Sequence, residues 1–174
     1  MEKGDREGAE IGFRDAIRVQ PDFAPAHNNL AKVLAARGDF LQAQYHFEKA
    51  IQNNAKFAQA RYDYGLTLTQ MELYDKAEAQ LEAAIRLEPA WAEAHNTLAE
   101  VLAIRRKTEE AILHYERALE LNPTYHEAHF NLGSVLVLKK NLPQARVHFE
   151  KAAESPDPAI RQGALESIAK ITHR

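Results

Sequence analysis

Residues 24–57 of the 174-residue chain read APAHNNLAKVLAARGDFLQAQYHFEKAIQNNAKF, and this stretch decides the fold. In its first half, Leu30 and Leu34 recur at the spacing of one helix face. Gly38 and Asp39 then interrupt the pattern, because glycine accepts left-handed backbone angles and aspartate caps a following helix. A second apolar stripe of helical spacing follows. The stretch therefore predicts two helices joined by a tight turn.

The same pattern recurs along the chain with a period of 34 residues. Two positions of the period carry alanine in every copy, and a third position between them carries a large apolar residue. The alanine series are Ala9, Ala43, Ala77, Ala111, Ala145 and Ala16, Ala50, Ala84, Ala118, Ala152, and the large series is Phe13, Phe47, Leu81, Tyr115, Phe149. Alanine lets two helices cross closely. Self-similarity at this period is typical of a helical solenoid, in which each unit buries its apolar face by stacking on its neighbours.

The period predicts a single array over residues 1–174, built from units that each contain a helix A and a following helix B. Four complete units are expected at residues 24–57, 58–91, 92–125 and 126–157. Because a solenoid has no single central core, the length of the chain reflects the number of units.

The two ends of the array differ from its interior. Residues 1–23 correspond to the helix B of a truncated unit, with a turn at Gly4-Asp5 and a helix over Arg6–Val19. This missing helix A favours a piece of a longer protein or a trimmed terminus. At the other end, Asp157-Pro158 is typical of an N-cap and a first helical residue. Residues 158–174 are therefore predicted to form a C-terminal capping helix.

The chain resembles the tetratricopeptide repeat (TPR) family over nearly its whole length. The family pattern places a large residue and then Leu-Gly in helix A, an alanine, an aromatic residue and a second alanine in helix B, and a proline at the end. Residues that illustrate it here are His129, Leu132, Gly133, Ala111, Tyr115, Ala118 and Pro123. The resemblance implies an all-α fold, a right-handed superhelical solenoid of antiparallel helix pairs. Three turns depart from the pattern, since Glu72, Arg106 and Lys140 replace the customary glycine.

Composition argues against several classes of function. The chain has no cysteine, which removes disulfides, thiolate chemistry and cysteine-based zinc sites. Its net charge is −3 and it has no long basic run, which disfavours nucleic acid or an anionic membrane as a partner. No apolar run approaches the roughly 18 residues that span a bilayer, and the N-terminus lacks a secretory signal. These features favour a cytoplasmic location, and the plain, regular repeats favour a bacterial source.

The eight histidines do not predict a metal or catalytic site. His126 and His129 lie three residues apart on one predicted helix, without a third ligand at a suitable spacing. Other histidines recur at two positions of the period, which are His27, His95, His129 in helix A and His46, His114, His148 in helix B. Equivalent side chains in successive units lie roughly 10 Å apart, so we expect them to serve packing. We expect no catalytic residue, no cofactor and no metal.

The TPR resemblance implies a binding face, because helices A line a concave groove that holds an extended peptide or a partner helix. The residues expected on this face are Asn28, Asn29, Lys32, Tyr62, Asp63, Leu66, Asn96, Thr97, Glu100, Phe130, Asn131 and Ser134. Asparagine both donates and accepts hydrogen bonds, which suits the backbone of an extended peptide. Asn29, Asp63, Thr97 and Asn131 resemble an imperfect form of the asparagine ladder in O-linked N-acetylglucosamine transferases. The alternative is a merely solvated polar face. Helices B are expected to carry mixed charges without a comparable apolar patch.

These patterns favour a non-catalytic protein–protein interaction scaffold. The alternative is the TPR arm of a larger enzyme, such as a glycosyltransferase, whose catalytic domain lies outside this chain. Because Asp63, Glu93, Glu100 and Glu127 outweigh Lys32 on the predicted face, a neutral or basic segment is the expected ligand. The Lys and Arg clamp of chaperone-binding TPR proteins is absent. Self-association through the N-terminal helix is a further expectation, since its apolar face lacks a helix A.

Overall fold

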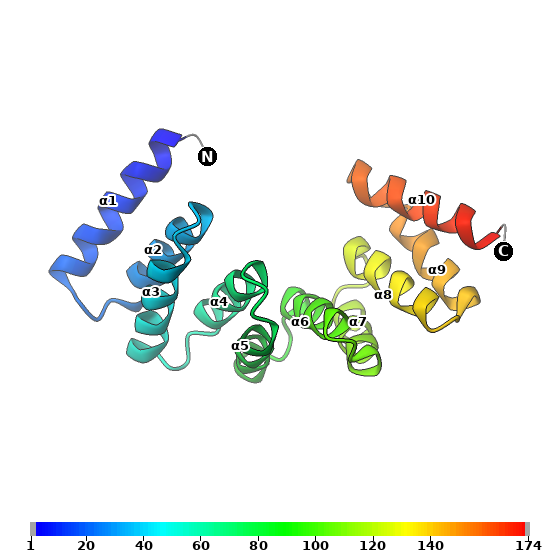
Figure 1. Ribbon diagram of the computed structural model, residues 1–174, viewed down its shortest axis with the longest axis horizontal. Coiled ribbons are helices and arrows are strands. Elements are labelled where there is room, and N and C mark those ends of the chain that lie inside the picture. The colour runs from blue at the N-terminus through cyan, green and yellow to red at the C-terminus, as the bar shows by residue number, and fades with distance from the viewer. Residues whose placement is uncertain (1–2, 173–174) are drawn as a thin grey trace. The chain divides into compact units, whose positions relative to one another are not determined.

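The computed structural model describes residues 3–172, which form ten α-helices and contain no strand (Figure 1). In chain order they are α1 (Lys3–Val19), α2 (Ala24–Ala36), α3 (Phe40–Asn53), α4 (Ala58–Gln70), α5 (Tyr74–Leu87), α6 (Ala92–Ile104), α7 (Thr108–Leu121), α8 (His126–Leu138), α9 (Leu142–Ala152) and α10 (Pro158–Thr172). From α2 to α9 the helices form sequential antiparallel pairs, each an A helix followed by its B helix. The predicted all-α repeat fold is confirmed.

A residue with left-handed backbone angles closes each turn between the two helices of a pair. The four residues are Gly38, Glu72, Arg106 and Lys140, with φ of 84°, 59°, 62° and 60°. In each turn the next N–H donates to a leucine carbonyl five residues earlier at 2.9 Å, as Asp39 does to Leu34. The three turns without glycine therefore keep the same geometry, and their non-glycine residues adopt strained left-handed backbone angles.

The recurring residues fill the interior of each helix pair. All four members of the large apolar series from Phe47 to Phe149 are buried, as are the alanines beside them. Glycine allows the closest approach. A Cβ on Gly65 would lie 2.7 Å from Leu81 Cγ, and a Cβ on Gly133 would lie 2.8 Å from Phe149 Cε1. Packing at these crossings leaves no room for a methyl group.

The first helix differs from the prediction at its beginning. It runs from Lys3 through Gly4 and Asp5, where we expected a turn. A turn between helices A and B reverses the chain between two packed helices, whereas within residues 3–172 α1 packs only on α2. From Glu7 onward no side chain of α1 is fully buried.

The last helix packs on α8 and α9. Oδ1 of Asp157 accepts a hydrogen bond from the backbone N–H of Ala159 at 2.8 Å, which caps the helix. The ring of Phe130 on α8 lies so close to Gly163 that a Cβ there would be 3.2 Å from it. The helix A of the last repeat is thus partly covered by α10.

The chain divides into two compact units, Met1–Pro89 with α1–α5 and Ala90–Arg174 with α6–α10. Within residues 3–172, no helix combines the length and apolar composition that crossing a lipid bilayer requires.

Candidate functional site

A buried carboxylate joins the two A helices of the first unit. Asp63 of α4 is 5% exposed, and its Oδ2 accepts a hydrogen bond from Asn28 Nδ2 of α2 at 2.9 Å. Its Oδ1 accepts from Gln59 Nε2 at 2.9 Å, and Lys32 Nζ lies 3.3 Å from Oδ2. The negative charge is therefore compensated by two amides and an ammonium group. This cluster holds α2 and α4 in a defined register.

The second unit contains an equivalent link between α6 and α8. Oε1 of Glu100 accepts hydrogen bonds from Asn96 Nδ2 and Asn131 Nδ2, both at 2.8 Å. Burial and the negative charge of Glu127 raise the pKa of Glu100, while the two amide donors oppose the rise. The two amide donors thus stabilise the ionised form of Glu100, which burial and Glu127 disfavour.

These links use a different pairing from the ladder suggested by equivalent repeat positions. The structure joins Asn28 to Asp63, and Asn131 lies 3.5 Å from Asn96, so each link spans 35 residues instead of 34. The amide N–H groups of these asparagines donate to protein carboxylates. In addition, Oδ1 of Asn28 is buried without a hydrogen-bond partner in the described part of the chain. These asparagine links therefore connect consecutive A helices within each unit.

Burial divides the twelve predicted face residues into three groups. Asn28, Asp63, Asn96 and Thr97 are buried. Asn29 and Lys32 are exposed, while Tyr62, Leu66, Glu100, Phe130, Asn131 and Ser134 are half-buried. Phe130 packs against Phe149, with ring centroids 5.8 Å apart, and contacts α10, whereas Ser134 donates its hydroxyl proton to the Phe130 carbonyl. The accessible part of the predicted face is therefore smaller than the sequence indicated, and its two exposed members, Asn29 and Lys32, both lie on α2.

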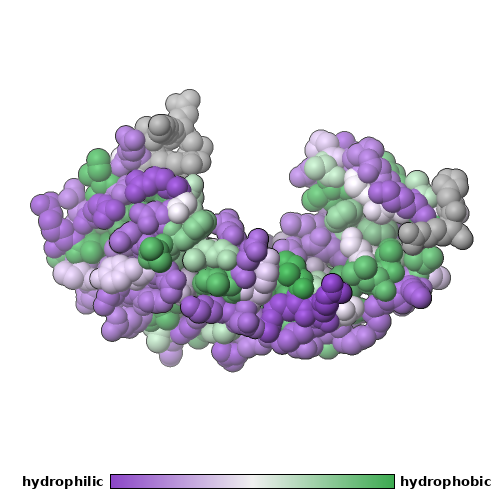
Figure 2. Space-filling view, in the orientation of Figure 1, coloured by the Kyte–Doolittle hydropathy of each residue, from purple (hydrophilic) through white to green (hydrophobic). Residues whose placement is uncertain are grey.

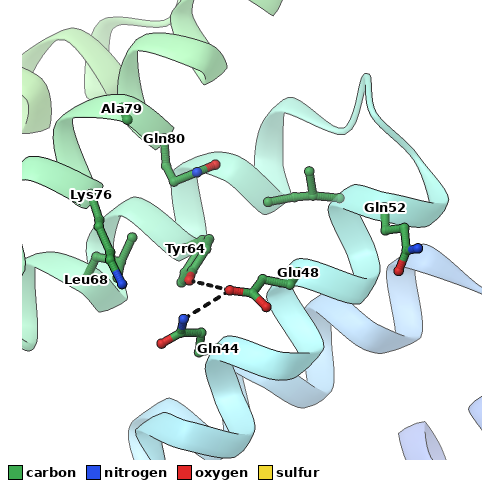
Figure 3. A pocket seen from close by; sticks show the side chains of 9 residues that line it. Gln44, Glu48, Gln52, Tyr64, Leu68, Lys76, Ala79 and Gln80 are labelled. Carbon is green, nitrogen blue, oxygen red and sulfur yellow. Dashed lines mark hydrogen bonds between the residues drawn. The ribbon is translucent and has the colours of Figure 1, made fainter.

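On the other side of the first unit, a depression of about 430 Å³ lies between α3, α4 and α5 (Figure 3). Tyr64 donates its hydroxyl proton to Glu48 Oε1 at 3.2 Å, and Gln44 Nε2 donates to the same oxygen at 3.0 Å. Burial and Glu48 raise the pKa of Tyr64, which keeps its hydroxyl a donor. Lys76 lines the depression from α5. With charges of both signs in its lining, the depression favours neither cations nor anions.

Helices B carry exposed apolar residues that we did not expect. One repeat position is occupied by Ile11, Tyr45, Leu113 and Val147, each more than half exposed, with Ala79 as the exception. These side chains stand among charged neighbours, and the face in Figure 2 likewise shows apolar residues scattered among predominantly polar ones. Single helix-B positions are therefore apolar and exposed, while the expectation of mixed charges without a comparable apolar patch stays a prediction.

Sequence reasoning also missed how the histidines pair. Each recurring histidine of helix A faces the histidine 19 residues later in helix B of the same repeat, with 2.9 Å between their Nδ1 atoms. The pairs are His27 with His46, His95 with His114, and His129 with His148. The constant offset of 19 residues was the available signal. Within the described residues, no group of three or more histidine, aspartate or glutamate side chains is placed to hold a metal ion.

Comparison with known families identifies the repeat. Profiles described as tetratricopeptide repeat match residues 1–56 and 34–101, and a profile described as TPR repeat matches residues 105–140. The chain is a TPR protein. Such repeats generally act as protein-binding scaffolds. A search of curated protein sequences finds no match.

Solved TPR structures are similar over most of the chain. PilF of Pseudomonas aeruginosa is 21% identical with a TM-score of 0.84, covering 97% of this chain and 82% of that one. A MamA structure from Desulfovibrio magneticus RS-1 is 26% identical with a TM-score of 0.79, covering 87% and 86%. YrrB, described as a TPR protein with an unusual peptide-binding site, is 23% identical with a TM-score of 0.77, covering 94% and 84%. At such low sequence identities, the structural similarities establish the fold that these proteins share with the chain.

Proposed function

We propose that this TPR protein is a non-catalytic scaffold whose helix-A faces bind an extended, neutral or basic segment of a partner protein. The observation that carries the proposal is the buried Asn28–Asp63 link between α2 and α4. It fixes the two helices that carry Asn29, Lys32, Tyr62 and Leu66, the accessible members of the face in the first unit. A face that is ordered before binding loses little conformational entropy when a ligand arrives.

Charge supports the preference for a neutral or basic ligand. In the first unit Lys32 offsets the charge of Asp63. In the second unit Glu93 and Glu127 are exposed and Glu100 is half-buried. A basic segment therefore gains electrostatic attraction from the second unit, whereas an acidic segment is repelled by it.

The proposal is tested with extended peptides of neutral, basic and acidic composition, titrated against the chain by fluorescence anisotropy. We expect the basic peptides to bind most tightly. Tyr62→Ala should weaken the binding by about tenfold, the scale of losing one aromatic contact in an interface. Tyr45→Ala is the matched control, because it removes an exposed tyrosine from helix B of the same unit. Equal losses in both variants, or tightest binding of acidic peptides, would overturn the helix-A assignment.

A further inference from the structure

Three of the four repeats use a hydrogen bond between two imidazoles to join helix A to helix B. The Nδ1–Nδ1 distance is 2.9 Å in each pair, and the ring centroids are 5.1 to 5.2 Å apart. The centroid separation is close to the nitrogen separation plus one ring radius on each side. The two nitrogens therefore face each other along the line between the rings, and one must donate while the other accepts.

Backbone contacts determine which nitrogen donates. Nε2 of His27 lies 2.9 Å from the carbonyl oxygen of Pro21, and Nε2 of His129 lies 3.2 Å from that of Pro123. A carbonyl only accepts, so Nε2 of these two helix-A rings carries the proton. In a neutral ring the Nδ1 atom is then an acceptor. The helix-B histidine, such as His46, must supply the N–H of the pair.

This arrangement restricts where further protons can bind. A first added proton can bind only Nε2 of the helix-B imidazole, where it places a charge in a largely desolvated site. A second proton must bind Nδ1 of the helix-A imidazole, which removes the acceptor and leaves two cations in contact. The hydrogen bond is therefore present when the pair is neutral or carries one positive charge, and it is lost when both rings are charged.

The surroundings of the first pair oppose protonation. His27 and His46 are both more than nine-tenths buried. Burial, followed by the charges of His27 and of Arg14 on α1, lowers the pKa of His46 to about 4. Arg14 is itself paired with Glu10 at 2.9 Å, and the ring of Tyr45 meets His46 edge-on.

The two pairs of the second unit have more mixed surroundings. Burial and His95 lower the pKa of His114, while Glu110 of the same helix opposes this. Burial also lowers the pKa of His129, reinforced by His126 and Lys151 and opposed by the Pro123 carbonyl and Glu154. The pKa of His148 is lowered by burial and by His129. The neutral form of His114, His129 and His148 is therefore favoured.

The remaining repeat makes the same connection without histidine. Arg61 and Gln80 occupy the equivalent positions, and Arg61 Nη1 donates to Gln80 Oε1 at 3.3 Å. Arg61 Nη2 reaches the carbonyl of Ala55 at 3.4 Å, which corresponds to the proline carbonyl of the other repeats. Neither side chain titrates near neutral pH. The chain thus contains its own pH-insensitive version of the connection.

Each pair lies next to the proposed binding face. His27 precedes Asn28, which holds Asp63, and His95 precedes Asn96, which holds Glu100. A helix A that loosens from its helix B therefore displaces the residues that link it to the next A helix.

We propose that the three histidine pairs are pH-sensitive latches that stabilise the packing of helix A against helix B at neutral pH and lose this stabilisation progressively as the pH falls, while the connection in the repeat at residues 58–91 does not change. The consequence for partner binding, a loss of affinity in acid, rests on the function proposed above. The sign follows from linkage. A histidine that stays neutral when folded contributes its full stability above the unfolded pKa of about 6.5 and loses it as the pH falls toward the folded pKa.

The test compares the wild type with a variant in which all three histidine pairs are replaced by the arginine–glutamine pair found at Arg61 and Gln80. Its substitutions are His27→Arg, His46→Gln, His95→Arg, His114→Gln, His129→Arg and His148→Gln. Urea unfolding is followed by circular dichroism between pH 8 and pH 5. Below pH 6.5 the wild-type unfolding constant should rise by about tenfold per pH unit for each proton taken up, and the variant should show a much smaller rise. Parallel pH profiles of the two proteins would overturn the proposal.

Because six substitutions together can prevent folding, a second measurement uses the wild type alone. Long-range proton–nitrogen NMR spectra of the imidazoles report the tautomer and titration of each ring. We expect Nε2–H rings in helix A, Nδ1–H rings in helix B, and midpoints of His46, His114, His129 and His148 below the ordinary histidine value of about 6.5. Midpoints of these four rings at the ordinary value of about 6.5 would refute the latches. Absence of peptide binding at every pH would instead refute the proposed function and leave these two readouts decisive for the latches.

Discussion

At the scale of single residues, Glu100 contributes an unfavourable charge to the link between α6 and α8. Since its pKa is raised in the folded state, the carboxylate costs stability at neutral pH, and this cost vanishes as the pH falls below the unfolded value of 4.5. Glu100→Gln keeps an oxygen that accepts from Asn96 and Asn131 and removes the charge. We expect the variant to be more stable by about 1 kcal/mol at pH 7, with the difference disappearing near pH 4 in urea titrations.

The matched control is Glu93→Gln on the same helix, where the side chain is exposed. This substitution removes the same charge without relieving burial, so its stability should stay within about 0.5 kcal/mol of the wild type. A similar gain in both variants would show that net charge, and not the burial of Glu100, is responsible.

At the scale of helix pairs, Gly133 sets how closely α8 approaches α9. A Cβ at this position would lie 2.8 and 2.9 Å from two atoms of the Phe149 ring, which is 2% exposed and cannot easily move. Gly133→Ala should therefore destabilise the chain by about 1–3 kcal/mol. Gly12→Ala, in α1 with nothing within 4 Å of the added methyl group, should stabilise it by about 0.5–1 kcal/mol. Urea unfolding measures both, and a shift of the same sign would contradict this packing argument.

The turns between paired helices allow a second prediction at this scale. Arg106 has a φ of 62° between α6 and α7, where Gly38 has 84° in the equivalent turn of the first complete repeat. Glycine adopts such angles without steric cost. Arg106→Gly should raise the free energy of unfolding by about 0.5–1 kcal/mol, and Gly38→Ala should lower it by a similar amount. Thermal melts that leave both variants unchanged would show that the turn is not strained.

At the scale of the whole molecule, Phe13 indicates where a second copy can bind. It is half-buried, whereas its counterparts Phe47, Leu81, Tyr115 and Phe149 are fully buried, and Leu81 and Phe149 pack against a glycine in the helix A of their own repeat. Within residues 3–172, α1 packs only on α2. We therefore predict self-association through α1, seen as a mass that rises with concentration in light scattering. Phe13→Ser should abolish the rise, and a concentration-independent wild-type monomer would rule the association out.

The local architecture follows from the amino-acid sequence alone. Residues such as Ala43, Phe47 and Leu34 recur with the period of the helix pair. Apolar side chains that recur on one face of a helix are stabilised by burial against the neighbouring helix, so the period predicts the helix pairs. The left-handed turns were likewise placed by Gly38 and its counterparts, although three of them carry no glycine.

The tertiary structure alone decided which side chains meet. Asn28 pairs with Asp63 across 35 residues, and His27 pairs with His46 across 19, because the rotation and offset between packed helices set these distances. Phe130 is covered because α10 packs across α8, which no periodic pattern records. Repeat periodicity specifies which side chains each helix buries. Polar contacts between helices depend in addition on shifts of a few ångströms between the packed helices, which the sequence period does not specify.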